Sequence, residues 1–257
     1  MKAHRTLQER LSVRRALFGI LQTHPNTAFA ELAAVCGYDF IVLDCEHGLF
    51  SDDDLLRTLQ ALSFSDILVL IRLRGHDTRA IGRHLDIGAN GIVAPDVSTA
   101  DDARALAAAM IYPPAGTRGF GAAAHRATRY GIDLAAHLSA PRAASSLIVQ
   151  IESAAGVANA GAIFSVTGVD AAIIGPADLA ASLGCTGNYA SPTYREAISR
   201  VETAARERGA ILGTAPHGEH SLEPLLARGH RLIILGADTP LIRHAMREQL
   251  DKAWSCL

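Results

Sequence analysis

Residues 40–50 read FIVLDCEHGLF, and this stretch decides the fold. Its first four residues are all apolar, without the apolar–polar alternation of a strand that has one face in water. A continuous apolar run is typical of a strand covered on both faces, as in a parallel sheet. The run then ends in Asp44, Glu46 and His47. The fold must therefore explain why a buried strand ends in two acids and an imidazole.

Seven similar runs, rich in Val, Ile and Leu, occur along the chain at residues 16–21, 67–72, 91–95, 147–152, 171–176, 210–215 and 231–236. Stretches with helical spacing of apolar residues separate them. Eight strands that alternate with helices in 257 residues predict an α/β protein with a (β/α)8 barrel. We expect a single domain over residues 1–257 with a short N-terminal helical lead-in. A doubly wound open sheet is the alternative, but no G-x-G-x-x-G motif opens a helix after the first strand.

Two segments depart from this regular spacing. The interval between residues 95 and 147 predicts a helix, a long loop and a second helical piece, and loops of this length are often functional. The last helical stretch carries Leu241, Ile242, Ala245, Met246, Leu250 and Trp254. This is more apolar surface than one barrel flank needs, so we expect this helix to pack on a neighbouring subunit.

The composition excludes several classes of protein. The formal net charge is −2, which provides no basic field for nucleic acid. No apolar run approaches the ~18 residues that span a bilayer, and the charged N-terminus does not resemble a signal peptide. The four cysteines are scattered without paired spacing, as in a protein of a reducing compartment. We therefore expect a cytoplasmic protein with no nucleic-acid or membrane partner.

Polar residues gather where the predicted strands end. In a barrel of this kind the chemistry lies at the carboxyl-terminal ends of the strands. Besides the residues after the second strand, these ends carry Arg72, Gln150, Glu152 and Asp178. Glu152 and Asp178 end adjacent strands, about 4.8 Å apart, so their carboxylates can converge on one point. Such a pair suits Mg²⁺ or Mn²⁺ with open positions for water or substrate, although a helix cap and a salt bridge are the alternative roles.

The remaining candidates each have two interpretations. Arg72 either forms a structural ion pair with a nearby acid or binds a substrate carboxylate. His47 is either a general base, oriented by a hydrogen bond from its imidazole to Asp44, or a histidine that merely packs near a loop. A zinc site that includes Cys45 and His47 is a weaker possibility. We interpret the histidines of HGEH, residues 217–220, as part of a solvated turn.

The lysine content restricts the mechanism of any carbon–carbon chemistry. Of the 24 lysine and arginine residues, only Lys2 and Lys252 are lysines, and neither lies on a predicted strand. A Schiff base on a barrel lysine is therefore excluded. A metal ion or hydrogen bonds would have to stabilise an enolate.

Several motifs, in this order along the chain, resemble those of one family: DCEHG (44–48), IRLRG (71–75), GANGIVAPDVSTADDA (88–103), YPPAGTRGFG (112–121), VQIESAAGV (149–157) and GPADLAASLG (175–184). They resemble the metal-dependent class II pyruvate aldolases of the 4-hydroxy-2-oxoheptanedioate aldolase family. The resemblance extends from about residue 14 to residue 250. It implies a barrel, a homo-hexamer with the C-terminal helix on a neighbouring subunit, and reversible cleavage of 4-hydroxy-2-oxo acids to pyruvate, or a related 2-oxo acid, and an aldehyde.

The resemblance also implies roles for individual residues. Glu152 and Asp178 would bind the divalent cation, which would be Mg²⁺ or Mn²⁺, with Co²⁺ also compatible. Residues that would hold the 2-oxo acid are Arg72, Gln150, Ala177 and Asp178. His47, with Asp44, would be the acid/base, and Glu46 and Asp86 would be supporting acids. The chain departs from the family pattern at HRATRYG (125–131) and at Cys45, which concerns the aldehyde end of the pocket.

Three other functions are compatible with parts of the pattern. A lyase for acyl-CoA esters would share the fold, but the chain has no clear basic patch for the CoA phosphates apart from residues 72–84. A non-catalytic barrel that binds small acids would not need the full set of metal, arginine and base positions. A phosphate-binding isomerase is disfavoured because Asp238 stands where a phosphate would need bare amides.

Overall fold

The computed structural model describes residues 6–139 and 145–257, and within them eight parallel strands form a closed barrel in sequential order. The strands are β1 (Leu17–Gln22), β2 (Phe40–Asp44), β3 (Leu68–Arg72), β4 (Gly91–Ala94), β5 (Ser146–Ile151), β6 (Ala171–Ile174), β7 (Leu212–Thr214) and β8 (Leu232–Ala237). Each predicted run is a strand, with bounds that differ by at most two residues. The barrel prediction is confirmed, and the pairing of β1 with β8 excludes the open sheet.

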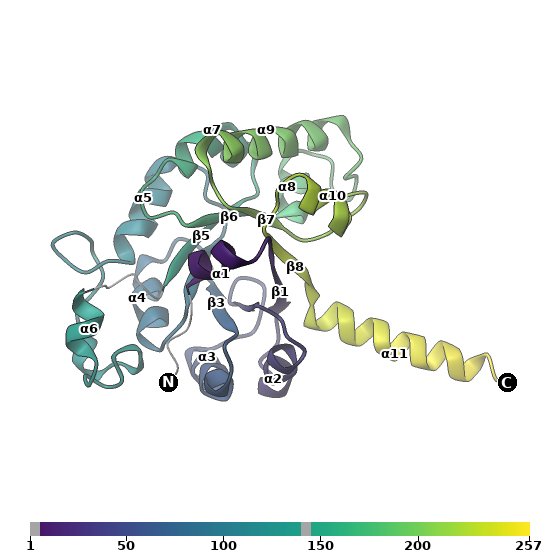
Figure 1. Ribbon diagram of the computed structural model, residues 1–257. Coiled ribbons are helices and arrows are strands. Elements are labelled where there is room, and N and C mark those ends of the chain that lie inside the picture. The colour runs from purple at the N-terminus through teal and green to yellow at the C-terminus, as the bar shows by residue number, and fades with distance from the viewer. Residues whose placement is uncertain (1–5, 140–144) are drawn as a thin grey trace.

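Helices cover the outside of the barrel (Figure 1). They are α2 (Thr27–Val35), α3 (Asp52–Ala61), α4 (Thr78–Asp86), α5 (Ala100–Ala109), α7 (Ala154–Phe164), α8 (Pro176–Ser182), α9 (Pro192–Arg208) and α10 (Leu222–Ala227). Short 3-10 turns are η1 (Leu62–Phe64), η2 (Ala122–Ala124) and η3 (Arg126–Thr128), and α6 (Leu134–Ser139) completes the long connection between β4 and β5. Ser51 and Thr99 start α3 and α5 with capping boxes, which satisfy the free backbone N–H groups there.

The apolar side chains of the strands divide between two layers. In β2, Phe40 and Val42 belong to the cluster inside the barrel, whereas Ile41 and Leu43 pack against the surrounding helices. The inner cluster also includes Leu7 and Leu11, from α1 (Leu7–Val13). Arg231, directly before β8, donates hydrogen bonds to the carbonyls of residues 11, 14 and 15. The helix α1 is thus fixed over the amino-terminal end of the barrel, and the polar side chains lie at the other end.

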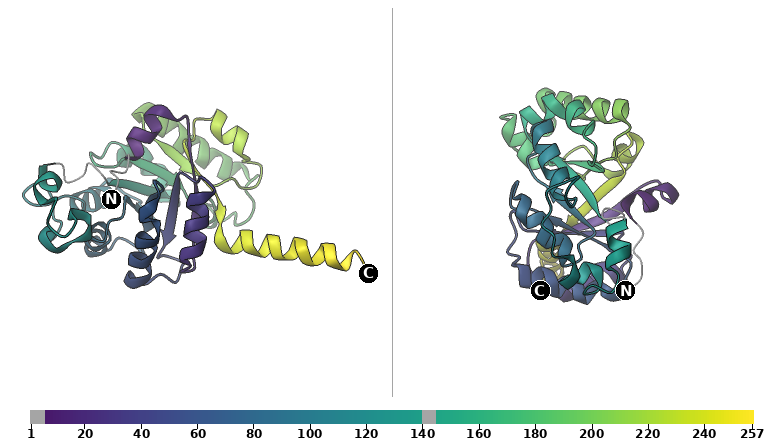
Figure 2. Two further views of the ribbon diagram at one scale, coloured as in Figure 1. Left: turned by 60° about the horizontal axis from the view of Figure 1, so that its bottom comes forward. Right: turned by 90° about the vertical axis from the view of Figure 1, so that its left-hand side faces the viewer.

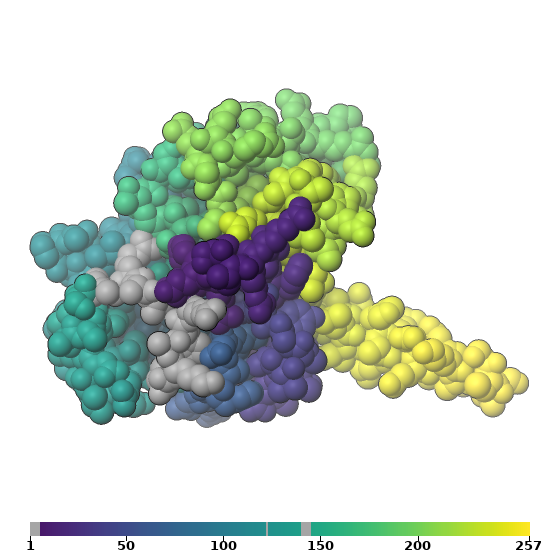
Figure 3. All heavy atoms as spheres, viewed as in Figure 1, coloured from purple at the N-terminus to yellow at the C-terminus, as the bar shows by residue number. Residues whose placement is uncertain are grey.

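The last helix, α11 (Asp238–Trp254), projects away from the barrel in Figure 1, in the left-hand view of Figure 2 and in Figure 3. Asp238 is its only buried residue. Leu241, Ile242, Met246, Leu250 and Trp254 are all exposed. Among the described residues, none of the helices has the length and apolar character needed to cross a bilayer.

Candidate active site

Asp44 and Arg72 form a buried ion pair at the mouth of the barrel. They end β2 and β3 and are directly paired in the register of the two strands. The guanidinium donates through Nε and Nη2 to the two carboxylate oxygens, at 2.8 and 2.7 Å. Burial alone would lower the pKa of Arg72, but the hydrogen bond and charge of Asp44 outweigh it and raise that pKa. Asp44 therefore binds the edge of the guanidinium formed by Nε and Nη2, which is the structural ion pair considered in the sequence analysis. Nη1 lies on the other edge.

The expected hydrogen bond between Asp44 and the imidazole of His47 is not formed. Asp44 Oδ1 instead accepts from the backbone N–H groups of Glu46, at 2.9 Å, and His47, at 3.4 Å. These bonds turn the chain after β2, and with Arg72 they occupy the carboxylate. The charged group nearest the imidazole is Glu46, whose Oε2 lies 3.8 Å from His47 Nε2 and 3.3 Å from Arg72 Nη1. The side chain of His47 is 62% exposed, so it stands at the open mouth.

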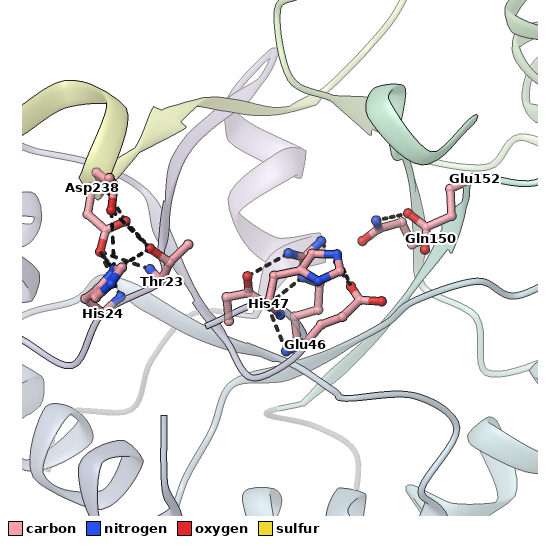
Figure 4. Close-up of polar contacts among 10 residues, drawn as sticks. Thr23, His24, Glu46, His47, Gln150, Glu152 and Asp238 are labelled. Carbon is pink, nitrogen blue, oxygen red and sulfur yellow. Dashed lines mark hydrogen bonds and ion pairs between the residues drawn. The ribbon is translucent and has the colours of Figure 1, made fainter. Parts of the chain in front are cut away.

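Gln150 and Glu152 lie at the end of β5 and are both buried. Gln150 Nε2 donates to Glu152 Oε2, and the backbone N–H of Asp96 donates to Glu152 Oε1 at 2.7 Å. Burial, with the nearby charges of Glu46 and Asp178, raises the pKa of Glu152 to about 7 despite these hydrogen bonds. Figure 4 shows Gln150 and Glu152 on one side of the mouth, with Glu46 and His47 in the middle. Among the residues that the structure describes, no cationic side chain forms an ion pair with Glu152, although the charge of Glu152 helps to raise the pKa of Arg72.

Ala177 and Asp178 lie in the first turn of α8, directly after β6. Both are exposed. The charge of Asp178 contributes to the raised pKa of both Glu46 and Glu152, which places its carboxylate near theirs. The chain reaches α8 through Gly175, where a Cβ atom would overlap Glu152 Oε2 and lie 2.8 Å from Gln150 Nε2. Only glycine allows the backbone to approach these two side chains so closely.

The donor set fits a hard divalent cation with few protein ligands. Within residues 6–139 and 145–257 there is no group of three or more His, Cys, Asp or Glu side chains arranged to hold a metal, which disfavours a structural zinc site. Cys45 is buried, and burial raises its thiol pKa to about 11, which also disfavours zinc. Magnesium, in contrast, is often bound by one or two carboxylates plus substrate and water. The buried carboxylate of Glu152, with the charge of Asp178 nearby, fits that pattern.

Asp86 lies apart from this cluster, and its role as a supporting acid stays a prediction. It ends α4, and the chain then enters β4 from the amino-terminal end of the barrel. Its Oδ1 pairs with Arg118 Nη2, at 2.5 Å, and lies 3.0 Å from His125 Nδ1. These three residues help to line a pocket of about 690 Å³ on the outside of the barrel. The helix α4 thus separates Asp86 from the mouth.

One polar cluster at the mouth was not predicted from the sequence. Thr23 and His24, after β1, contact Asp238, at the start of α11 (Figure 4). Thr23 and His24 follow the first predicted strand, so their position at a strand end was visible in the sequence. Asp238 is distant in sequence, and only the closure of the barrel between β1 and β8 brings it there.

The interpretation of HGEH as a solvated turn is wrong for its second histidine. His220 is buried, and His217 and His220 are joined by reciprocal backbone hydrogen bonds. The Tyr194 hydroxyl lies 2.7 Å from His217 Nε2, and Arg228 Nη2 lies 2.8 Å from His220 Nδ1. The two imidazoles therefore form part of the packing between the β7–α10 connection and α9.

The chain is similar in sequence to a known protein family and to several characterised proteins. Residues 18–245 match the family model described as HpcH/HpaI aldolase/citrate lyase. The chain is 37% identical over 241 residues to the hydroxypyruvate/pyruvate aldolase of Pseudomonas aeruginosa, an alignment that covers 94% of this chain and 90% of that protein. It is 34% identical over 243 residues to the 2-keto-3-deoxy-L-rhamnonate aldolase of Shigella sonnei, with 95% and 91% covered.

Solved structures show the same fold. An HpcH/HpaI aldolase/citrate lyase family protein from Burkholderia cenocepacia superposes with a TM-score of 0.90 at 30% identity and covers 96% of this chain and 98% of its own. The citrate synthase SbnG superposes with a TM-score of 0.87 at 25% identity, with 97% and 98% covered.

Proposed function

Since the chain belongs to the HpcH/HpaI aldolase/citrate lyase family and is a carbon–carbon lyase of the class II aldolase type, we propose that it reversibly cleaves 4-hydroxy-2-oxo acids to pyruvate, or a related 2-oxo acid, and an aldehyde. Class II aldolases generally depend on a divalent cation. We propose that Glu152 and Asp178 hold this ion, as Mg²⁺ or Mn²⁺, with Co²⁺ as a substitute.

One observation carries the proposal: Glu152 is a buried carboxylate with a raised pKa at the same barrel mouth as a buried arginine. Arg72 is fixed by Asp44, so Nη1 is positioned without further loss of side-chain freedom. From there it can donate to the carboxylate of a 2-oxo acid. The amide of Gln150, and the first turn of α8 at Ala177 and Asp178, would border the same acid on its other side.

The chemistry that the cation supplies when bound is Lewis acidity toward the negative charge that develops on the keto oxygen. The residues of the chain supply orientation and proton transfer. In the cleavage direction, His47 Nε2 takes the proton of the C4 hydroxyl as the C3–C4 bond breaks. Glu46 faces the imidazole at 3.8 Å and stabilises the positive charge that the ring then carries. In the synthetic direction His47 returns this proton to the new hydroxyl.

Proton exchange at the methyl group of pyruvate tests the proposal without an aldehyde. In deuterated water the protein should exchange these protons with Mg²⁺ or Mn²⁺ present and should stop after EDTA treatment and dialysis. Glu152→Gln should lose both exchange and tight metal binding, because a neutral amide is a poor ligand for a hard cation. Glu223→Gln, a matched change on the exposed face of α10, is the control. Full exchange by metal-free protein would refute the metal-dependent mechanism.

We further propose that α11 packs on a neighbouring subunit and that the enzyme is a homo-hexamer. The exposed apolar side chains along α11 support this arrangement, since isolated helices rarely present such a row to water. An assembly also gives Asp86 a route to an active site, because its own chain does not bring it to the mouth. We propose that Asp86 supports the site of a neighbour.

We place the enzyme in the cytoplasm. This location is supported by the cysteines, all four of which are free.

A further inference from the structure

A second polar cluster lies across the barrel mouth from Glu152 (Figure 4). Thr23 and His24 follow β1, and Asp238 begins α11 directly after β8. Because β1 and β8 are the two strands that close the barrel, they bring these residues together although they are more than 200 positions apart. The proposed site uses the ends of β2, β3, β5 and β6, and this cluster occupies the opposite edge.

Asp238 is an ionised, almost fully buried centre for the cluster. It accepts hydrogen bonds from the backbone N–H groups of Thr23 (3.0 Å), His24 (2.9 Å) and Thr239 (2.9 Å). The hydroxyl of Thr23 lies 2.8 Å from its Oδ1. Burial alone would raise the pKa of Asp238, but these hydrogen bonds outweigh burial and lower that pKa below its usual value. The carboxylate can therefore only accept.

This arrangement fixes the proton on His24. The hydroxyl hydrogen of Thr23 must be donated to Asp238, since the carboxylate has none to give. His24 Nδ1 lies 2.9 Å from Thr23 Oγ1 and 3.3 Å from Thr239 Oγ1. At the shorter of these contacts Thr23 can act only as an acceptor. Nδ1 must carry a hydrogen, so in the neutral ring Nε2 is the unprotonated nitrogen.

The free nitrogen of His24 is available to a ligand. None of the residues that the structure describes forms a hydrogen bond with Nε2, and the side chain is 59% exposed. A histidine held at Nδ1, with an open acceptor at Nε2, is prepared to receive a hydrogen bond from a hydroxyl group. In a (β/α)8 barrel the loops that follow the strands build the substrate site at this mouth. A substrate bound at Glu152 by its 2-oxo acid end would extend from β5 toward this edge.

We propose that His24 recognises the aldehyde part of the substrate, by accepting a hydrogen bond at Nε2 from a hydroxyl group of that aldehyde. This inference rests on the proposed aldolase function and adds the chemical class of the second substrate. The preferred aldehyde is a neutral hydroxyaldehyde. Anionic aldehydes are disfavoured because the ionised carboxylate of Asp238 lies beside His24.

Paired aldehydes test the proposal. The aldol addition of pyruvate to glyceraldehyde and to propanal, which has the same carbon chain without hydroxyl groups, is measured for wild-type enzyme and for His24→Ala. We expect kcat/KM for glyceraldehyde to fall about three- to tenfold, the size of one hydrogen bond, and kcat/KM for propanal to stay unchanged. The KM for pyruvate and the methyl exchange should also be unchanged.

Thr23 is a positioning residue in this scheme and gives a second variant. Thr23→Val removes the acceptor for Nδ1–H and should reproduce the selective loss for glyceraldehyde, whereas Thr23→Ser keeps the hydroxyl and should restore the wild-type ratio. An equal fall for both aldehydes, or no fall for either, would overturn the role of His24 while methyl exchange persists. A wild-type enzyme without methyl exchange would overturn the aldolase function itself, and the role of His24 with it.

Discussion

Asp44 acts on Arg72 rather than on the imidazole of His47, and this changes what its substitution should do. In Asp44→Asn the buried guanidinium loses its charged partner, which typically costs about 3–5 kcal/mol of stability for a buried pair. We expect a lower urea midpoint and a raised KM for pyruvate, because Arg72 is no longer held toward the substrate. The variant Asp53→Asn, on the exposed first turn of α3, is the control. An Asp44→Asn enzyme with wild-type stability and a loss confined to kcat would instead favour the original assignment to His47.

The substitution His47→Ala should separate proton transfer from binding. The imidazole is largely exposed and makes no hydrogen bond among the described residues that would hold the fold together. We therefore expect kcat to fall by roughly 10²–10⁴, the usual contribution of a general base, with little change in pyruvate affinity or in the urea midpoint. Steady-state kinetics across pH 6 to 9 check this. Wild-type aldol rates over that range would remove His47 from the mechanism.

Sequence spacing was sufficient to find these residues but not to pair them. Asp44, Arg72, Gln150 and Glu152 were found because they directly end apolar runs, and barrel geometry puts such ends at one mouth. The partner of Asp44 could not be found in this way. A carboxylate three residues before a histidine can bond either the ring or the backbone N–H of the turn, and the register with β3 decides between them.

The turn between β7 and α10 predicts a pH-dependent stability. Burial lowers the pKa of His217 and of His220, so the unfolded chain binds protons more readily than the folded one. The contribution of these histidines is intact above pH 6.5, their ordinary pKa, and stability falls as the pH drops below it. In His220→Gln the amide can still accept from Arg228 but cannot titrate. Urea unfolding at pH 7.5, 6 and 5 should therefore show a shallower decline for His220→Gln than for wild-type protein.

Two other histidines, the buried His84 and the half-buried His137, also have lowered pKa values, so wild-type stability will decline for several reasons. The difference between the two proteins isolates residue 220. Parallel pH curves for His220→Gln and wild type would show that the buried imidazole does not contribute.

At the level of elements, the sequence predicted strands far better than side-chain environments. Continuous apolar runs identified the eight strands because most of these strands are buried on both faces, although Leu235 of β8 is exposed. The HGEH segment has no such pattern. Its burial depends on Tyr194, Arg228 and the closing of α9 over the turn, which no local window contains.

At the level of the whole molecule, the proposed role of Asp86 depends on assembly. Within one chain Asp86 ends α4 and lies away from the barrel mouth. If each subunit contributes its Asp86 to the active site of a neighbour, every site contains His47 from one subunit and Asp86 from another. His47→Ala and Asp86→Asn then remove different parts of that shared site. Each variant alone should have low aldol activity, and co-expressed mixtures should recover part of it, because some sites then combine His47 and Asp86 from unlike subunits. Sedimentation of each sample checks that the assembly itself persists.

A mixture no more active than the sum of its components would contradict the shared site, as would full activity of Asp86→Asn alone. The position of Asp86 beside Arg118 and His125 could not be predicted from the motif that contains it. A motif records which residues recur together, and it does not record whether one chain or two bring them into contact.

The apolar cluster inside the barrel, with α1 over its amino-terminal end, leaves the site open to solvent at the mouth alone. Gln150 and Glu152 are buried inside that entrance, whereas His24 and His47 are exposed at its rim. Two reactants that enter by the same opening must bind in order. The one that binds deeper must bind first and dissociate last. The kinetic scheme implied by a sealed barrel is therefore compulsory-order, with the 2-oxo acid as the leading substrate in synthesis and the aldehyde as the first product to leave in cleavage.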